Sequence, residues 1–378
     1  MNHEPRPRTG FGRIELVICL GIAITGLAMV LPIANTVGCR SARLQSQQNL
    51  HLQHMIHELY AADWNQRQFT AVPDDLGVYG GDCAAWEAAN GRTIPGLELG
   101  TDCSGERVGF FDCASAPVRS PIDLDFIDAP YRLPIKGSYT TAGAYRFPNC
   151  AALNQYASGR YHDSIFWAPD DVWNMRYAKP YLDGDCSYDA PPHRPLATSS
   201  YIMSPAAMFD PLVMGTDDAD EGNYYWNDPN SFADGYRSPS VTACEHPALK
   251  TRMIEHHIVE TVLPATIWNG FSQNLPAGNR RAPVPCLFNQ SLHGRPLALF
   301  FDGSVRIHTM QEAMQSDDRV RKTSDSYWEG LTTRVNGQDY FTDRLMGTGF
   351  PGSQQDGSNH HVFTRKGIKG RDTLSTGQ

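Results

Sequence analysis

The sequence predicts an α+β protein in which one long N-terminal helix packs on a mostly antiparallel β-sheet head with long loop-rich insertions. Three observations lead to this fold class. Residues 16–34 form an uncharged apolar run, a helical period of apolar residues follows it, and the 378-residue chain carries 26 prolines and 33 glycines. Such a content of proline and glycine favours short strands and long turns over further helices.

The apolar run from Leu16 to Ala34 has the length of one membrane crossing. About 20 apolar residues in a helix span a hydrocarbon core of roughly 30 Å. Glu15 stands directly before the run, and an ionised carboxylate near lipid needs a partner or a function. Pro32 interrupts the run and predicts a kink, because an interior proline removes one helical hydrogen bond. We expect a transmembrane helix over residues 11–37.

The helix is expected to continue as an amphipathic stretch over residues 38–68. Apolar residues recur there at steps of roughly three and four among Gln, His and Arg: Leu44, Leu52, Met55, Ile56 and Leu59. One helix from about Ile14 to about Gln66 is predicted. Such a rod suits the bundled core of a filament, and a surface helix packed on the head fits the same pattern.

The N-terminus resembles the class III signal of type IV prepilins and pseudopilins, in its residues Arg6, Arg8, Gly10, Phe11 and Glu15. The resemblance implies a leader over residues 1–10, cleavage after Gly10 by a prepilin peptidase, and methylation of the new amino terminus of Phe11. Glu15 would then neutralise the terminal amine of a neighbouring subunit. It also implies a type IV pilin-like fold.

Two residues depart from the usual prepilin pattern, because Gly12 and Arg13 stand inside the recognition stretch. An uncleaved signal anchor is therefore the alternative. Positive charges flank the apolar run on both sides, so the positive-inside rule gives only a slight bias. The resemblance implies a single-pass protein of the inner, or cytoplasmic, membrane, with its N-terminus inside and its head periplasmic or at the cell surface.

Two further elements resemble the planctomycete-type DUF1559 group of pilin-like proteins. In the helix, Pro32, Asn49, Leu50 and Tyr60 stand at matching spacing, while Ser46 and Gln48 replace a Cys and an Asn of that group. Near the C-terminus the run from His293 through Asp302 and Gly303 to Arg306 resembles its H-X9-DG element, with eight intervening residues instead of nine. Any disulfide made by the group's Cys is therefore absent or rerouted here.

The same C-terminal run predicts a β-hairpin of the head. Residues 297–301 form a short apolar strand, Asp302 and Gly303 a two-residue turn, and residues 304–308 a returning strand with alternating faces. Residues 199–204 and 252–259 are the other candidates for the sheet core. We place the head at residues 69–352 and a polar tail at 353–378.

Cysteine usage predicts disulfides in an oxidising compartment. A zinc site is the alternative, but the sequence holds no C-x-x-C pair, and the connectivity cannot be read from spacing. The candidates are Cys83, Cys103, Cys113, Cys150, Cys186, Cys244 and Cys286.

Composition and motifs argue against several function classes. A net charge of −9 disfavours nucleic-acid binding, which needs clustered Lys and Arg. The acidic run 217–223 does not have EF-hand spacing. Ser115 to Arg119 matches only the core of a sulfatase motif, and Glu255 beside His256 and His257 lacks the zinc-protease spacing, so we read it as the surface end of a strand. We expect no enzyme activity, no cofactor and no metal.

The sequence therefore favours a pilin-like or pseudopilin-like structural subunit of a membrane-rooted filament or type II secretion-like assembly. Its expected partners are membrane lipid, a prepilin peptidase and other pilin-like subunits. The alternative is a membrane-anchored extracytoplasmic binding protein that does not polymerise. Its ligand surface would be the aromatic loops around Trp167, Trp173, Tyr224, Tyr225 and Trp226.

Overall fold

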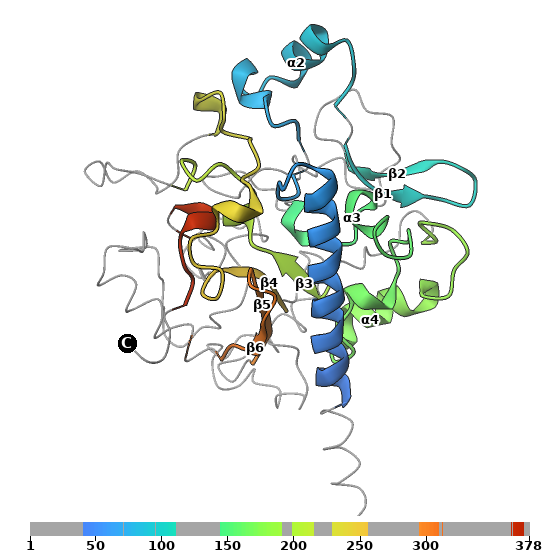
Figure 1. Ribbon diagram of the computed structural model, residues 1–378. Helices are drawn as coiled ribbons and strands as arrows, with labels where there is room; N and C mark the ends of the chain where they lie inside the picture. Colours follow the sequence, from blue (N-terminus) through green and yellow to red (C-terminus); the bar gives the residue numbers. More distant parts are fainter. Residues whose placement is uncertain are drawn as a thin grey trace, which may run out of the picture. The chain divides into compact units, whose positions relative to one another are not determined.

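The computed structural model describes residues 41–70, 72–94, 96–110, 144–190, 199–214, 229–255, 295–309, 312, 364 and 366–373. Contacts between Cα atoms divide the chain into two compact units, Met1–Leu44 and Gln45–Gln378. The description below concerns the second unit, which holds the sheet and nearly all of the described residues (Figure 1).

The longest helix of the described chain covers residues 41–63 and ends in a turn at residues 64–66. This agrees with the predicted end of the helix near Gln66. Asn65 and Gln66 take positive φ values of 55° and 62°, which is how a helix commonly stops. The Gln66 N–H donates to the Ala61 carbonyl at 2.6 Å and closes this last turn. The blue helix of Figure 1 is this element.

Four strands form one antiparallel sheet in the order β3-β4-β5-β6. The strands are β3 Tyr201–Met203, β4 Thr251–Glu255, β5 Leu297–Phe300 and β6 Val305–Ile307. All residues of β3, β4 and β5 are buried, so both faces of the sheet are covered. The prediction of an α+β fold with an antiparallel sheet is confirmed, and the three predicted sheet segments supply its strands.

The hairpin between β5 and β6 pairs Leu297 with Ile307 and Leu299 with Val305. Its loop has three residues instead of the expected two, because the Phe300 N–H donates to the Ser304 carbonyl and the Gly303 N–H to the Phe300 carbonyl. Gly303 has a φ of 81°, the left-handed value that this loop requires.

The remaining described elements are short, as the loop-rich composition predicts. A second sheet pairs β1 Leu97–Thr101 with β2 Arg107–Phe110. The helices are α2 Cys83–Asn90, α3 Ala151–Asn154 and α4 Val172–Ala178, and Asp82 caps α2 by accepting from the N–H groups of Ala84 and Ala85. The 3-10 helices are η1 Leu76–Tyr79, η2 Ala144–Arg146, η3 Ser164–Phe166, η4 Lys179–Tyr181, η5 Pro205–Ala207, η7 Pro229–Ser231, η8 Val241–Ala243 and η12 Gly367–Lys369.

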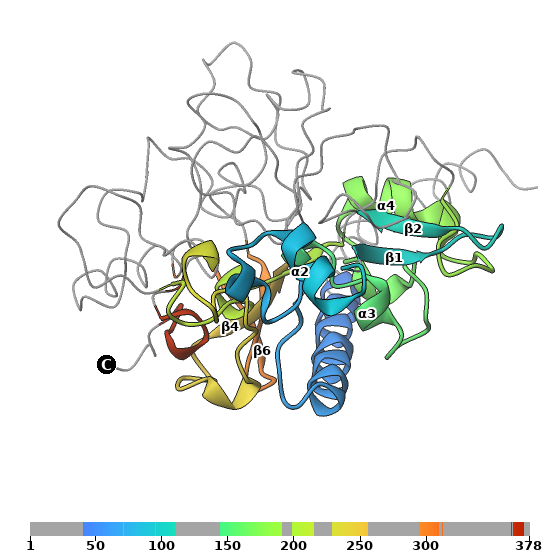
Figure 2. The same cartoon turned by 90° about the horizontal axis from the view of Figure 1, so that it is seen from above.

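The long helix lies between the four-stranded sheet and a second group of elements, which consists of β1, β2, α3 and α4. Figures 1 and 2 both place β1, β2, α3 and α4 on one side of it and β4 and β6 on the other. The core runs through both groups, and its largest fully buried side chains include Trp86, Trp167, Tyr161 and Tyr201.

Part of the segment that we expected to be a polar tail is folded onto the head. Ile368 is fully buried, and the N–H groups of Asp372 and Thr373 donate to the Leu249 carbonyl at 3.0 and 3.2 Å. Lys250 is also fully buried, and its Nζ lies 2.9 Å from an Asp372 carboxylate oxygen. Residues 366–373 therefore belong to the head.

Several predictions fall outside the described residues. They concern the leader and its processing residues Gly10, Phe11 and Glu15, together with Pro32, the apolar run, His293, Cys113, Cys286, the acidic run 217–223 and the sulfatase-like residues 115–119. Among the helices that are described, none has both the length and the apolar character needed to cross a bilayer.

Candidate functional site on the long helix

The face of the long helix that contacts the head carries several polar side chains. The Asn49 amide donates to the Trp167 carbonyl at 3.0 Å, and the Gln53 amide donates to the Ile165 carbonyl at 2.8 Å. These two carbonyls lie in and beside η3, a short segment that leaves backbone acceptors without sheet or helix partners. Because a buried carbonyl needs a donor, polar residues are the appropriate choice at this contact.

A second polar contact joins the helix to the edge of the four-stranded sheet. The Ser46 hydroxyl and the Tyr201 hydroxyl are hydrogen-bonded at 2.7 Å, and Ser46 also donates to the Glu255 carboxylate. The other Glu255 oxygen accepts from the Leu297 N–H at 2.7 Å. Glu255 ends β4 as predicted, but it is buried and not at the surface, because these donors solvate its charge. Burial raises the pKa of Tyr201, and the nearby Glu255 carboxylate adds to the effect.

Apolar anchors complete this inner face. Leu50 is fully buried, and Ile56 and Tyr60 are nearly so. The Tyr60 ring meets Phe69 edge-on at a centroid distance of 5.7 Å and Tyr156 at 6.2 Å. Asn49, Leu50 and Tyr60, the helix residues that match the pilin-like group, thus all point into the head.

The opposite face of the helix exposes large apolar side chains, which we call the outer ridge: Leu52, Met55 and Leu59, exposed at 41%, 54% and 51%. Leu44, about two further turns towards the N-terminus, is exposed at 60%. Of the five apolar residues that predicted the amphipathic helix, only Ile56 is buried. The helical period of the apolar residues was predicted correctly. The face that packs on the head, however, is the partly polar face of the helix.

A charged cluster lies where the helix crosses β4. Arg252 is almost completely buried and forms an ion pair with Glu58 of the helix. Its guanidinium carbon lies 5.2 Å from the centre of the Phe301 ring, within the range of a cation–π contact. A bulge in the pairing of β4 with β5 lies between Thr251 and Met253, so Arg252 is the extra residue. A bulge re-aims the side chain that it carries, and here the side chain reaches the helix.

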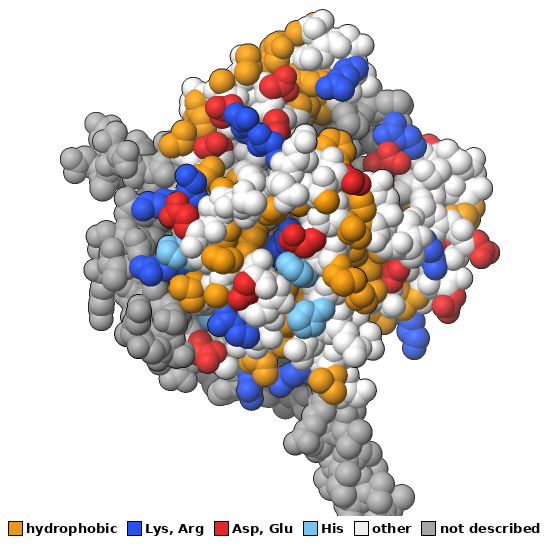
Figure 3. All heavy atoms as spheres, viewed as in Figure 1, with side chains coloured by type: hydrophobic (Ala, Val, Ile, Leu, Met, Phe, Trp, Pro, Cys, Tyr) orange, Lys and Arg blue, Asp and Glu red, His pale blue; other side chains and the backbone are white. Residues whose placement is uncertain are grey.

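Two histidines of the helix belong to the same cluster. Arg252 Nη1 lies 3.2 Å from His54 Nδ1, and His57 is fully enclosed beside them. Burial lowers the pKa of both imidazoles, and the Arg252 charge lowers the pKa further. A Cβ atom added to Gly303 would lie 2.9 Å from His54 Nε2, so the turn of the H-X9-DG-like element is in close contact with the helix. Figure 3 looks onto this surface and shows histidine, acidic and hydrophobic side chains side by side.

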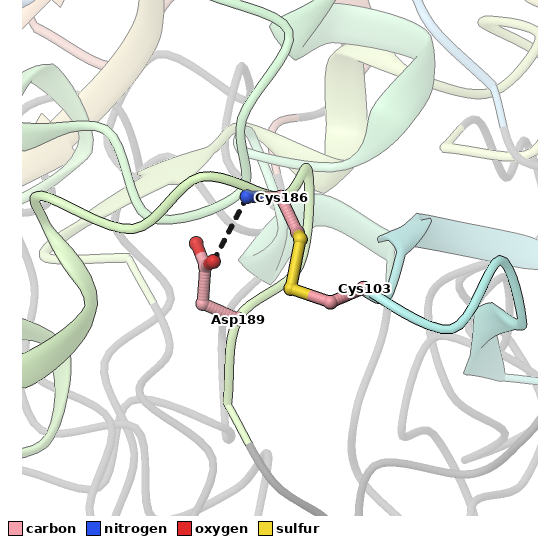
Figure 4. Close-up of side chains that lie close together, drawn as sticks. All are labelled: Cys103, Cys186 and Asp189. Atoms are coloured by element: carbon pink, nitrogen blue, oxygen red, sulfur yellow. Dashed lines mark hydrogen bonds between the residues drawn. A yellow bond between two sulfur atoms is a disulfide. The ribbon is translucent and has the colours of Figure 1, made fainter.

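A disulfide joins Cys103 in the β1–β2 loop to Cys186, 83 residues further on (Figure 4). Asp189 lies beside it, accepts from the Cys186 N–H at 2.9 Å and forms an ion pair with Arg160 at 3.3 Å. Ligand atoms of Cys103, Cys186 and Asp189 all lie within 4.8 Å of one another. The two sulfur atoms are bonded to each other, which leaves no thiolate for a metal ion.

The other described cysteines have two different outcomes. Cys83 is also disulfide-bonded, to a partner outside the described residues. Cys150 and Cys244 are free thiols, so the prediction is wrong for these two. Cys150 is completely enclosed at the start of α3, where burial raises its pKa to about 12 and makes it a small apolar side chain.

The aromatic ligand surface that we considered is not formed at Trp167. This side chain is buried and stacks on His162 at a centroid distance of 5.8 Å. Tyr161, Tyr181 and Tyr188 surround the same histidine, so the cluster is part of the core. Residues 224–226 and the side chain of Trp173 lie outside the described part of the chain.

Comparison with known proteins adds no relative. No known protein family, curated protein or solved structure matches this sequence. The residues of the helix and of its contact with the head therefore carry the functional argument.

Sequence reasoning missed the cluster around Arg252. The signal was present, since His51, His54 and His57 repeat every three residues and Glu58 follows His54 by one helical turn. No residue of the helix, however, identifies a partner on β4 that lies about 200 positions away in sequence.

Proposed function

We propose that this chain is a pilin-like or pseudopilin-like structural subunit of a membrane-rooted assembly. Its N-terminal segment would be processed by a prepilin peptidase at Gly10 and anchored in the cytoplasmic membrane by the apolar run, with the head outside. The proposed function is structural and not enzymatic, and the proposed partners are lipid, the peptidase and other pilin-like subunits.

The outer ridge is the observation that carries the proposal. Leu52, Met55 and Leu59 expose large apolar surface along one side of the helix, while the other side is fixed to the head. Exposed apolar surface that is contiguous along an element usually marks an interaction site. A subunit that packs helix against helix needs such a side.

The inner face supports the same function. Hydrogen bonds from Ser46, Asn49 and Gln53 and the buried Leu50 hold the helix on the sheet and on η3. The ridge is thereby presented to solvent on a supported helix. The net charge of −9 fits a soluble head and offers no basis for nucleic-acid binding.

Substitution of the ridge tests the proposal. In the double variant Leu52→Gln with Leu59→Gln we expect assembly in membranes to weaken about 5- to 30-fold, because the two side chains together contribute about 1–2 kcal/mol of apolar burial. Chemical crosslinking followed by gel electrophoresis measures the ladder of oligomers. The ridge side chains are exposed, so the fold should be preserved.

A matched control uses exposed apolar residues elsewhere on the head. Val78 and Leu212 are exposed at 62% and 63%, and the pair Val78→Gln with Leu212→Gln should keep the wild-type ladder. If the ridge variant forms the same oligomers as the wild type, the ridge is not the assembly surface.

A further inference from the structure

The hydrogen bond between Arg252 and His54 constrains the protonation state of the histidine. A guanidinium group has N–H donors only, so His54 Nδ1 must accept, at the measured distance of 3.2 Å. A neutral imidazole with its proton on Nε2 provides that acceptor. A protonated imidazole carries N–H groups on both nitrogens and cannot accept, and its charge would face the Arg252 charge.

Arg252 has little freedom to leave when His54 becomes charged. Its side chain is enclosed between the helix and β4, stacked near Phe301 and paired with Glu58. Its Nε and Nη2 atoms are buried and have no hydrogen-bond partner in the described part of the chain. Two cations forced together there are relieved most simply by separation of the helix from the strand.

We propose that the contact of the long helix with β4 and the Gly303 turn is a proton-sensitive latch, closed while His54 is neutral and opened when His54 takes a proton. The latch is independent of the assembly function proposed above. It would make the seating of the helix on the head respond to acidification.

The charged groups around the latch set the direction of the response. Arg252 opposes a charge on His54, as does His51, whereas Glu58 and Asp302 favour it. The charges of Arg252 and of a protonated His54 likewise lower the pKa of His57. Glu58 favours the charge of Arg252, whereas Cys244, whose pKa burial raises to about 11, is a neutral thiol in this pH range. Burial is the largest effect on both histidines, and it lowers the pKa.

The sign of the pH response follows from these directions. The open latch releases His54 to an ordinary pKa near 6.5, whereas the closed latch holds the pKa below that value. The closed state is therefore fully favoured above about pH 6.5 and loses stability as the pH falls below it. Each pKa unit of lowering multiplies the opening constant about tenfold on acidification.

Hydrogen exchange of the full-length protein in detergent, read by mass spectrometry, tests the latch. When the pH is lowered from about 7.5 to about 5, peptides of residues 45–63 should exchange about tenfold or more faster, after correction for the intrinsic exchange rate. Peptides of β3 and β5 report unfolding of the whole head. The latch predicts that the helix responds before these strands do.

Two substitutions at one position separate the latch from general acid sensitivity. In His54→Gln the amide oxygen can still accept from Arg252 but cannot be protonated, so the helix peptides should lose the part of their pH response that comes from His54 and keep only the part that comes from His57. In His54→Lys a permanent charge should leave the helix open at both pH values. The control His51→Gln, at an exposed position of the same helix, removes only a smaller effect on the pKa of His54 and should retain most of the response.

Three results would overturn the latch: helix peptides that exchange equally at both pH values, helix peptides that exchange only together with β3 and β5, or a full wild-type response in His54→Gln. None of these three results would change crosslinking through the outer ridge. The latch and the assembly function are therefore tested separately.

Discussion

Gly303 occupies a position that only glycine fits, for two independent reasons. Its φ of 81° lies in the left-handed region, and an added Cβ would lie 2.9 Å from His54 Nε2. The neighbouring Asp302 holds the turn by accepting from the Ser304 N–H and hydroxyl at 2.9 and 2.6 Å. The Asp-Gly pair thus forms the turn and also brings it into contact with the helix.

The variant Gly303→Ala should lower the free energy of unfolding by about 1–3 kcal/mol, since alanine is strained at this φ and also displaces His54. Urea unfolding of the full chain measures the loss. Gly105→Ala is the matched control, because Gly105 has a φ of 87° and nothing within 4 Å of its added Cβ. Equal losses in the two variants would show that contact with His54 contributes nothing.

At the scale of elements, the C-terminal segment is fixed to the start of β4 by a buried ion pair. Lys250 Nζ donates to Asp372 at 2.9 Å, to the Thr364 hydroxyl at 2.7 Å and to the Ser204 hydroxyl at 2.9 Å. The same Asp372 oxygen accepts from the Thr251 N–H at 2.8 Å. These bonds compensate the cost of burying both charges and tie Thr364 and residues 366–373 to the sheet.

Removal of one partner of this buried ion pair should therefore destabilise the protein strongly. Lys250→Met leaves the Asp372 carboxylate buried without its cation, and we expect the protein to lose about 3–5 kcal/mol of stability. The double variant Lys250→Met with Asp372→Leu should recover much of that loss, because no buried charge is left. A double-mutant cycle by urea unfolding measures both, and a Lys250→Met variant as stable as the wild type would contradict the assignment.

The strands were predictable because each one carries a local signal. Apolar residues flank Asp302 and Gly303 closely enough to mark a hairpin, and the segments 199–204 and 252–259 combine apolar and β-branched residues. The pairing of β3 with β4, which lie far apart in the sequence, could not be predicted from any local signal. The loop was predicted one residue too short, since a left-handed glycine serves both two- and three-residue loops.

The face of the helix was not predictable from its own sequence. Its apolar period marks Leu52, Met55 and Leu59, yet the head presents the carbonyls of Ile165 and Trp167, which require donors. Which stripe is buried therefore depends on residues more than 100 positions away. The same distance concealed Arg252 and its histidine partners.

At the scale of the whole molecule, two further buried histidines, besides His57 of the long helix, make the fold sensitive to acid. Burial lowers the pKa of His162 and of His308 from 6.5 to about 4. The unfolded chain binds these protons more readily than the folded chain, so stability is full above about pH 6.5 and falls as the pH approaches 4. Each histidine contributes about 3 kcal/mol to that fall.

Urea unfolding measured across this range should show the fall in stability, and His162→Gln should make the fall smaller by removing one of these groups. His51→Gln, at an exposed position, is the control and should leave the slope unchanged. A wild-type slope in His162→Gln would show that this histidine is not the acid-sensitive group.

The proposed function requires that the N-terminal segment is processed and serves as an assembly helix. The intact mass of the mature protein, purified from membranes, tests this most directly. We expect loss of residues 1–10 and one methyl group on the amino terminus of Phe11. A mature protein that retains its first ten residues, or that begins elsewhere without a methyl group, would contradict it.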